Sequence, residues 1–243
     1  MTELDIIIPV YNEGRNIIPV LEAFRSQVRT PFRVLICYDF DEDDTLDALT
    51  GFAADDMEIA RVKNPGRGPH SAVRAGFARS TASAALVYMA DDDYNADIID
   101  AMVAKFRDGC DVVAASRFIP GGSMVGGALH KVVIVRLGKF ALHHLARLPV
   151  HDPTNAFRLF SRRLLDTVEI ESERGFTFSV ELLAKAVRLG WKVDEVAAQW
   201  LERDDKPSRF RVFAWIPAYL RWLIYAMATA WLGRGPQTVK RKR

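Results

Sequence analysis

The chain has 243 residues, of which 49% are hydrophobic and 26% are charged, and its formal net charge is +2. These values are ordinary for a globular protein and exclude a disordered or collagen-like chain. A charge this close to zero gives no sign of a nucleic-acid-binding protein. The length suits one large α/β domain with an appendage.

The sequence predicts neither a secretion signal nor a membrane-spanning segment. Cys37 and Cys110 each lie inside an apolar run, which predicts buried, reduced thiols in a cytosolic protein. The N-terminal MTELDIIIPVYNE has acidic residues and a polar break after a short apolar run, unlike a signal peptide or anchor. Arg211, Pro217 and Arg221 interrupt the most hydrophobic segment, so no run of about 18 uncharged apolar residues exists.

Short apolar runs alternate with segments of helical spacing in the first half of the chain. Strands are expected at 5–10, 33–38, 58–62, 84–89 and 111–116, and helices at 13–27, 43–53, 67–80 and 94–108. This alternation predicts a largely parallel sheet covered by helices on both faces. Ligands bind such sheets beyond the carboxyl ends of the strands. The corresponding loops start near Tyr11, Asp39, Asn64 and Asp91.

After residue 120 the pattern changes. The loop PGGSMVGG leads into a basic amphipathic helix candidate at 129–148. Further elements are expected as a helix at 176–189, a strand at 191–200 and an aromatic-rich helix at 211–232. We therefore divide the chain into a main domain at 1–210, an amphipathic helix at 211–232 and a basic tail at 233–243, which is expected to be mobile.

Three consecutive carboxylates, Asp91, Asp92 and Asp93, follow the apolar run AALVYM. Carboxylates at positions i and i+2 of a turn after a strand can both reach one hard divalent cation. A solvated acidic turn is the alternative, but the place at the ligand edge of the sheet favours a metal site. A substrate that carries a pyrophosphate would complete the coordination of Mg²⁺ or Mn²⁺.

Two other polar segments follow predicted strands. Pro9-Val10-Tyr11-Asn12-Glu13 ends the first strand, and Asn12 there also suits a helix N-cap. The acidic stretch DFDEDD after the second strand is mostly explained by an exposed turn and by carboxylates at a helix start. Asp39 is the exception, because it is the first residue beyond the strand.

Together, DIIIPVYNE, YDFDEDDT, GRGPHSAVRAGFARS and MADDDYN resemble glycosyltransferase family 2 over most of residues 4–210. The resemblance implies a GT-A (Rossmann-like) α/β fold and a nucleotide-sugar donor. It assigns nucleotide-sugar binding to Pro9, Tyr11, Glu13, Asp39, Asp91 and Asp92, and the metal to Asp91, Asp93 and Asn95. The family's acidic loop more often reads DDGS. Here Tyr38 and Phe40 replace an Asp and a Gly, which leaves the choice of base open.

Later segments are similar to the dolichol-phosphate mannose synthase and bacterial polyprenyl-phosphate glycosyltransferase branch. They are ASRF at 115–118, HDPTNAFRLFSRRLL at 151–165, GFTFSVELLAKAVRLGWKVDEV at 175–196 and ERDDKPSRF at 202–210. The branch implies inverting transfer of a sugar to a polyprenyl or dolichyl phosphate. GDP-mannose is the first expected donor and a UDP-sugar the second. It assigns the acceptor phosphate to Arg117, Arg203, Ser208 and Arg209. Arg209 stands where the branch has a lysine and keeps the charge, while Asn155-Ala156 replaces the commoner Ser-Gly.

The chemistry of the acceptor decides which side chains catalysis needs. A lipid monophosphate has a second pKa near about 6 and is already an anionic nucleophile at neutral pH. The site must then supply cations, from a metal on Asp91 and Asp93 and from arginines such as Arg117. A sugar hydroxyl would instead need a general base, for which Asp152 is the candidate. With a lipid phosphate, Asp152 would position the acceptor loop or a neighbouring arginine, and an ion pair is the alternative role of Arg117.

The segments 129–148 and 211–232 combine apolar faces with Lys, Arg, Trp and Tyr, as helices in a membrane interface do. Ordinary packing on the domain is the alternative for 129–148. The aromatic residues of 211–232 require lipid, a partner protein or another subunit, and the basic tail favours an anionic membrane face. The prediction is a peripheral enzyme on the cytoplasmic side of a membrane.

Other functions are also open at this point. One is a family 2 transferase that uses a saccharide hydroxyl in cell-envelope polysaccharide synthesis. Another is a non-catalytic nucleotide-sugar-binding membrane scaffold, against which the set Asp91, Asp93, Arg203 and Arg209 argues. A dinucleotide-dependent oxidoreductase is disfavoured, because no GxGxxG follows the first strand.

Overall fold

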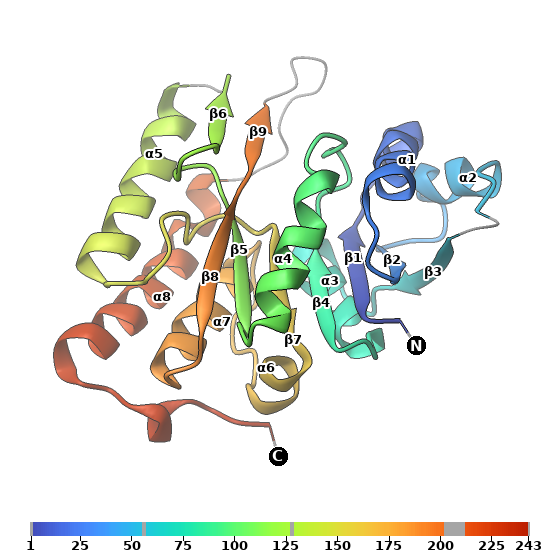
Figure 1. Ribbon diagram of the computed structural model, residues 1–243. Helices are drawn as coiled ribbons and strands as arrows, with labels where there is room; N and C mark the ends of the chain where they lie inside the picture. Colours follow the sequence, from blue (N-terminus) through green and yellow to red (C-terminus); the bar gives the residue numbers. More distant parts are fainter. Residues whose placement is uncertain (1, 55–56, 127–128, 202–211, 243) are drawn as a thin grey trace.

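A seven-stranded sheet with the strand order β3-β2-β1-β4-β7-β5-β8 forms the centre of the molecule (Figure 1). The structure is a computed structural model that describes residues 2–54, 57–126, 129–201 and 212–242. The main strands are β1 (Leu4–Pro9), β2 (Phe32–Tyr38), β3 (Glu58–Lys63), β4 (Ala84–Val87), β5 (Val112–Ser116), β7 (Arg158–Ser161) and β8 (Val193–Ala197). Six of them run parallel, and β7 is antiparallel to its neighbours β4 and β5. The predicted mostly parallel sheet is confirmed.

Helices cover both faces of this sheet because alternate strand residues point to opposite sides. The helices are α1 (Ile17–Gln27), α2 (Asp44–Thr50), α3 (Gly68–Arg79), α4 (Ile99–Arg107), α5 (Leu129–Phe140), α6 (Arg162–Thr167), α7 (Thr177–Arg188) and α8 (Val212–Leu232). Ile6 and Ile8 pack with α1, α2 and α4 in one apolar cluster. Ile7, between them, packs in the other cluster with α3, α6, α7 and α8.

Several predicted boundaries were wrong. The helix expected at 13–27 begins at Ile17, after a short 3-10 turn η1 (Gly14–Asn16), and Asn12 is not its N-cap. Asn12 has a φ of 51°, so the chain turns sharply before the helix. The strand expected at 191–200 is divided into β8 and β9 (Gln199–Leu201), and β9 pairs with β6 (Ser123–Val125) in a small second sheet.

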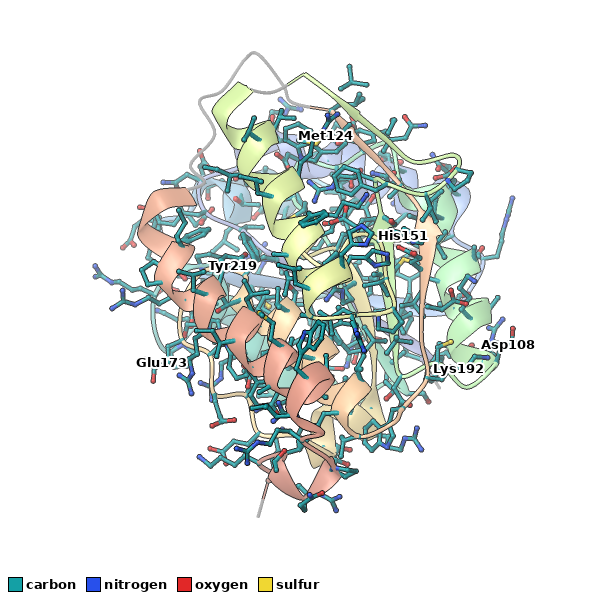
Figure 2. The ribbon with its side chains drawn as sticks, turned by 90° about the vertical axis from the view of Figure 1, so that its left-hand side faces the viewer. Asp108, Met124, His151, Glu173, Lys192 and Tyr219 are labelled. Carbon is teal, nitrogen blue, oxygen red and sulfur yellow. The ribbon has the colours of Figure 1, made fainter. Side chains whose placement is uncertain are left out.

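The C-terminal helix α8 packs against α7 and does not stand apart from the domain. Trp222 and Ala226 are buried in this contact, with 2% and 1% of their surface exposed. The Arg188 side chain on α7 donates hydrogen bonds to the Tyr225 carbonyl oxygen and the Thr229 hydroxyl, both at 2.6 Å. Figure 2 shows α8 beside α5 on one face of the molecule.

The basic tail was expected to be mobile, and this was wrong. Lys240 and Lys242 form backbone hydrogen bonds with Glu169 and Thr167, each at 3.0 Å. Val239 is buried, and the Lys240 ammonium pairs with the Glu169 carboxylate at 2.7 Å. The tail therefore lies along the segment that follows α6. No helix in the described ranges has the length and apolar character needed to span a bilayer.

Candidate active site

The loops after β2, β1 and β4 lie in a row, because these strands are neighbours and parallel. They carry Asp39, Tyr11 and Asp91 respectively. Tyr11 is half exposed, and its ring meets the Phe40 ring edge-on at a centroid distance of 5.5 Å. The residues predicted for the donor side therefore lie at one edge of the sheet, as the sequence predicted.

The loop that bears Tyr11 and Glu13 is held by the first turn of α2. The backbone amides of Asn12, Glu13 and Gly14 donate to Asp43, Thr45 and Asp44 at 3.0, 3.1 and 2.7 Å. Asp43 also caps α2 by accepting from the Thr45 amide, as expected for a carboxylate at a helix start. Asp43 is 1% exposed, however, so the expectation of an exposed turn was wrong for this residue.

Asp39 joins the end of β2 to the loop after β3. Its two carboxylate oxygens accept from the Asn64 side-chain amide at 2.6 Å and from the Gly68 backbone amide at 2.7 Å. Gly68 has a φ of 83°, a left-handed conformation that favours glycine. These contacts fix the direction of the carboxylate while each oxygen keeps a further lone pair.

The three aspartates after β4 face different ways. Asp92 is 8% exposed and accepts hydrogen bonds from the Asn95 backbone and side-chain amides at 3.1 and 2.8 Å. Burial raises its pKa to about 6. The Asp92 carboxylate is therefore turned into the protein, which argues against the predicted contact with the nucleotide sugar. Asp91 is exposed and Asp93 is half-buried.

Asn95 was predicted as a metal ligand, and its hydrogen bonds to protein groups argue against that role. It is 2% exposed, its side-chain amide donates to Asp92 and to the Gln199 carbonyl oxygen, and its Oδ1 accepts from the Gln199 amide at 2.8 Å. The Leu201 amide donates to the Tyr94 hydroxyl at 3.1 Å. Tyr94 and Asn95 therefore hold β9 against the aspartate turn. The chain then continues to Arg203, Ser208 and Arg209, which lie outside the described residues.

Two carboxylates suit a metal that a substrate helps to bind. Within the described residues no three His, Cys, Asp or Glu side chains converge on one point. A cation at Asp91 and Asp93 would therefore take its remaining oxygens from a diphosphate and from water, as Mg²⁺ does. The all-oxygen donor set fits Mg²⁺ or Mn²⁺.

Arg117 and Asp152 form a buried ion pair at the end of β5. Arg117 Nε and one terminal nitrogen donate to the two Asp152 oxygens at 2.6 and 2.9 Å, and Thr154 donates to Asp152 at 3.0 Å. Asp152 is fully buried. Burial alone would raise its pKa, but the Arg117 charge and hydrogen bonds outweigh burial and lower the pKa of Asp152 below its usual value.

This geometry bears on the roles predicted for Asp152 and Arg117. Both Asp152 oxygens already accept hydrogen bonds from Arg117, and one also accepts from Thr154, which argues against a general base at this position. The Arg117 side chain is 9% exposed and its charge is matched by Asp152, so the ion pair predicted as its alternative role is present. The positioning role of Asp152 stays a prediction.

Sequence comparison decides the family. The glycosyl transferase family 2 model matches residues 5–169. The chain belongs to glycosyl transferase family 2. The strands β1, β2 and β4, whose loops carry the residues predicted to bind the donor, all lie within the matched residues of this family 2 enzyme.

Relatives of this family 2 enzyme include a polyprenol monophosphomannose synthase and an uncharacterized glycosyltransferase. It is 24% identical over 213 residues to polyprenol monophosphomannose synthase of Mycolicibacterium smegmatis, covering 82% of this chain and 77% of that protein. It is 27% identical over 230 residues to an uncharacterized glycosyltransferase of Mycobacterium bovis, covering 93% of this chain and 95% of the relative.

Solved structures confirm the GT-A fold of the family 2 enzyme. Glucosyl-3-phosphoglycerate synthase from Mycobacterium tuberculosis, in complex with Mn²⁺, UDP and glucosyl-3-phosphoglycerate, matches with a TM-score of 0.67 at 16% identity. The match covers 94% of this chain and 79% of that one. The same synthase in complex with Mg²⁺ and UDP matches with a TM-score of 0.64 at 17% identity, covering 94% and 79%.

Sequence reasoning missed Arg158 in this family 2 enzyme. The side chain lies on β7, is fully buried, and donates to the Ser179 and Asp152 carbonyl oxygens at 2.5 and 3.2 Å. Burial lowers its pKa to about 10, so it remains charged at neutral pH. An arginine inside the apolar run AFRLF was the available signal, but the short β7 was not predicted. Arg158 adds a second cation behind Asp152.

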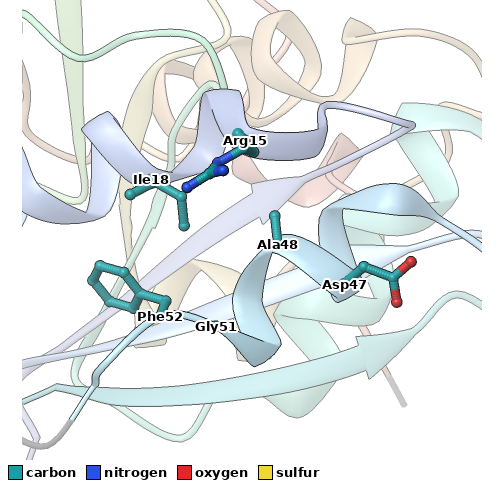
Figure 3. A pocket seen from close by; sticks show the side chains of 6 residues that line it. All are labelled: Arg15, Ile18, Asp47, Ala48, Gly51 and Phe52. Atoms are coloured by element: carbon teal, nitrogen blue, oxygen red, sulfur yellow. The ribbon is translucent and has the colours of Figure 1, made fainter.

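A pocket of about 280 Å³ opens between the start of α1 and α2 (Figure 3). Arg15, Ile18, Asp47, Ala48, Gly51 and Phe52 line it. None of the predicted site residues is among them. This pocket is therefore separate from the predicted site at the strand ends.

Proposed function

We propose that this family 2 enzyme transfers a sugar, with inversion, from a nucleotide sugar to a polyprenyl phosphate at the cytoplasmic face of a membrane. The observation that carries the proposal is the buried Arg117–Asp152 pair, in which Arg117 donates to both oxygens of the candidate general base. A phosphate acceptor needs no base, because it is already an anion at neutral pH, whereas a sugar hydroxyl does. The likeness to polyprenol monophosphomannose synthase supports the same acceptor class.

The donor side has a defined set of proposed contacts. Pro9, Tyr11, Glu13 and Asp39 line the nucleotide, and Asp91 and Asp93 hold Mg²⁺ or Mn²⁺. The metal, when bound, neutralises charge on the leaving nucleoside diphosphate. Arg203, Ser208 and Arg209 are proposed for the acceptor phosphate. GDP-mannose is the first donor to test because a relative is a mannose transferase, and UDP-sugars are the second.

Transfer to lipid is tested with purified protein, Mg²⁺ or Mn²⁺, radiolabelled GDP- and UDP-sugars and a polyprenyl phosphate in detergent. We expect label that is extractable into organic solvent, requires metal and carries an inverted anomeric centre by NMR. No lipid product, with metal-dependent nucleotide-sugar binding intact, would contradict the proposal. Turnover on a saccharide acceptor would then identify a polysaccharide transferase, and no turnover on any acceptor would identify a scaffold.

The membrane side of the proposal rests on one apolar face. Eight exposed large apolar side chains lie on α5, the adjoining π-helix η3 (Ala141–Leu145) and α8. They are Val133, Leu137, Phe140, Leu145, Leu220, Ile224, Trp231 and Leu232. The Trp231 indole donates to the Leu145 carbonyl oxygen at 2.6 Å, which joins the two helices. Figure 2 shows both helices on the viewer's side.

The sequence had indicated that the aromatic residues of α8 require an external partner, and this is wrong for Trp222. Trp222 is buried against the domain, and only part of the helix faces outward. Basic side chains accompany the apolar face, since the Arg147 guanidinium lies 4.3 Å from the Trp231 ring. Apolar and basic side chains together suit an anionic lipid interface.

Replacing Leu137 and Ile224 together by Glu is expected to weaken binding to vesicles of phosphatidylglycerol and phosphatidylcholine by at least roughly 100-fold. Both side chains are exposed on the apolar face, and their transfer from water into lipid favours binding. Vesicle flotation measures the effect. Ala104→Glu, at an exposed position of α4, is the control. Equal binding of all three proteins, or no binding by the wild type, would assign the face to a protein partner or a second subunit.

A further inference from the structure

Lys139 is a cation on α5 that lies over the Phe118 ring and pairs with no carboxylate of the described residues. Its ammonium lies 4.8 Å from the centroid of the Phe118 ring, and the Arg117 guanidinium lies 5.4 Å from the same centroid. Among the described residues Lys139 forms no ion pair. An aromatic face holds an ammonium but leaves its three N–H donors available.

Arg117 has the opposite character, although it lies at the same ring. Its charge is matched by the fully buried Asp152, through hydrogen bonds of 2.6 and 2.9 Å. Moving the guanidinium to a phosphate would leave the Asp152 carboxylate buried and uncompensated, which is costly. Arg117 is therefore suited to fix the neighbouring Phe118, and Lys139 is suited to meet an incoming anion.

The place of Lys139 on α5 fits an acceptor that is both anionic and apolar. A Cβ built on the preceding Gly138 would lie 3.4 Å from the Thr154 methyl group, so this side of α5 packs on the loop of Asp152. Leu137 and Phe140, on either side in sequence, are 62% and 54% exposed on the apolar face. Lys139 itself is half-buried. It lies where the apolar face meets the loop of Asp152 and the Phe118 ring.

We propose that Lys139 binds the acceptor phosphate directly and that Arg117 is a positioning residue, which holds Phe118 beneath the Lys139 ammonium. The prenyl chain would then lie along the apolar face beside Leu137 and Phe140. This inference rests on the proposed function, because it names the residue that receives the lipid phosphate.

A short prenyl monophosphate, which dissolves without a membrane, separates phosphate binding from vesicle binding. Lys139→Met keeps the length of the side chain and removes its charge, so we expect KM for geranyl phosphate to rise roughly 10- to 100-fold. We expect kcat to change much less, and metal-dependent binding of the nucleoside diphosphate to remain unchanged. Lys139→Arg should restore KM to within a few-fold, because the charge returns.

The matched control is Lys192→Met. Lys192 is exposed and donates to the Asp108 carbonyl oxygen beside α4, and Figure 2 shows both residues at the edge away from α5 and α8. The KM of the Lys192→Met variant for geranyl phosphate should equal that of the wild type. Equal KM values for Lys139→Met and wild type, with lipid product formed by both, would overturn the inference and leave the proposed function intact. A similar rise in the Lys192→Met variant would also overturn it, as a general charge effect. A wild type that neither binds nor glycosylates geranyl phosphate would overturn both proposals.

Discussion

Replacing Asp93 by Asn is expected to lower the rate of sugar transfer on the order of 10³-fold. Asp91 and Asp93 are the outward-facing carboxylates of the turn after β4, and no third protein ligand converges with them within the described residues. Removing one charge therefore removes half of the protein's negative charge on the metal. Initial rates over a Mn²⁺ titration measure the effect, and the midpoint should move to higher Mn²⁺.

The neighbouring Asp92 supplies a matched control, because Asp92→Asn makes the same chemical change one residue away. Asp92 is turned inward and accepts from Asn95, a contact in which an amide oxygen can replace a carboxylate oxygen. Its variant should keep the Mn²⁺ midpoint of the wild type. A variant pair in which Asp92→Asn loses metal dependence while Asp93→Asn keeps it would reverse the assignment of the two carboxylates.

The sheet could be predicted because its buried parallel strands are continuous apolar runs. Such runs alternate with helical segments, and the five expected strands correspond to β1 to β5. Strand β7 escaped prediction for two physical reasons. It is only four residues long, and its Arg158 side chain, which would mark a strand as exposed, is instead buried.

The donor edge could also be predicted, because parallel strands bring their carboxyl ends together without any knowledge of side-chain contacts. Asp39, Tyr11 and the aspartate turn follow three neighbouring strands. The direction of each polar side chain could not be predicted, since it depends on distant partners. Asn95 bonds to a residue 104 positions away, and Arg117 to one 35 positions away. Spacing alone does not show that these side chains face protein and not ligand.

The C-terminal part shows the same limit. The aromatic content of α8 predicted an amphipathic helix, and the helix is present. Composition does not show which side of the helix packs on α7, and Trp222 proved to be buried. Nor does the charge of the tail show that it pairs with the segment after α6, where its backbone finds hydrogen-bond partners.

Asp152→Ala is expected to lower the free energy of unfolding by about 3–5 kcal/mol, the usual effect of leaving one partner of a buried ion pair alone. Arg117 would lose its carboxylate while its side chain stays 9% exposed, and Arg158 lies fully buried behind it. Urea unfolding measures the change. The double variant Arg117→Met, Asp152→Leu should recover most of this stability, because apolar side chains of similar volume can replace a buried pair.

Stability and turnover together separate an ion pair from a general base at Asp152. In Asp152→Asn the side chain keeps its shape and loses its charge, so an ion-pair role predicts lower stability and a loss of transfer that follows the folded fraction. The double variant should then transfer sugar faster per total protein than Asp152→Ala, although Phe118 is held less firmly. A general base predicts the reverse pattern, because every variant without the carboxylate would be inactive however stable it is. A folded, stable Asp152→Asn protein that binds nucleotide sugar and does not turn over would therefore move the acceptor from a lipid phosphate to a sugar hydroxyl.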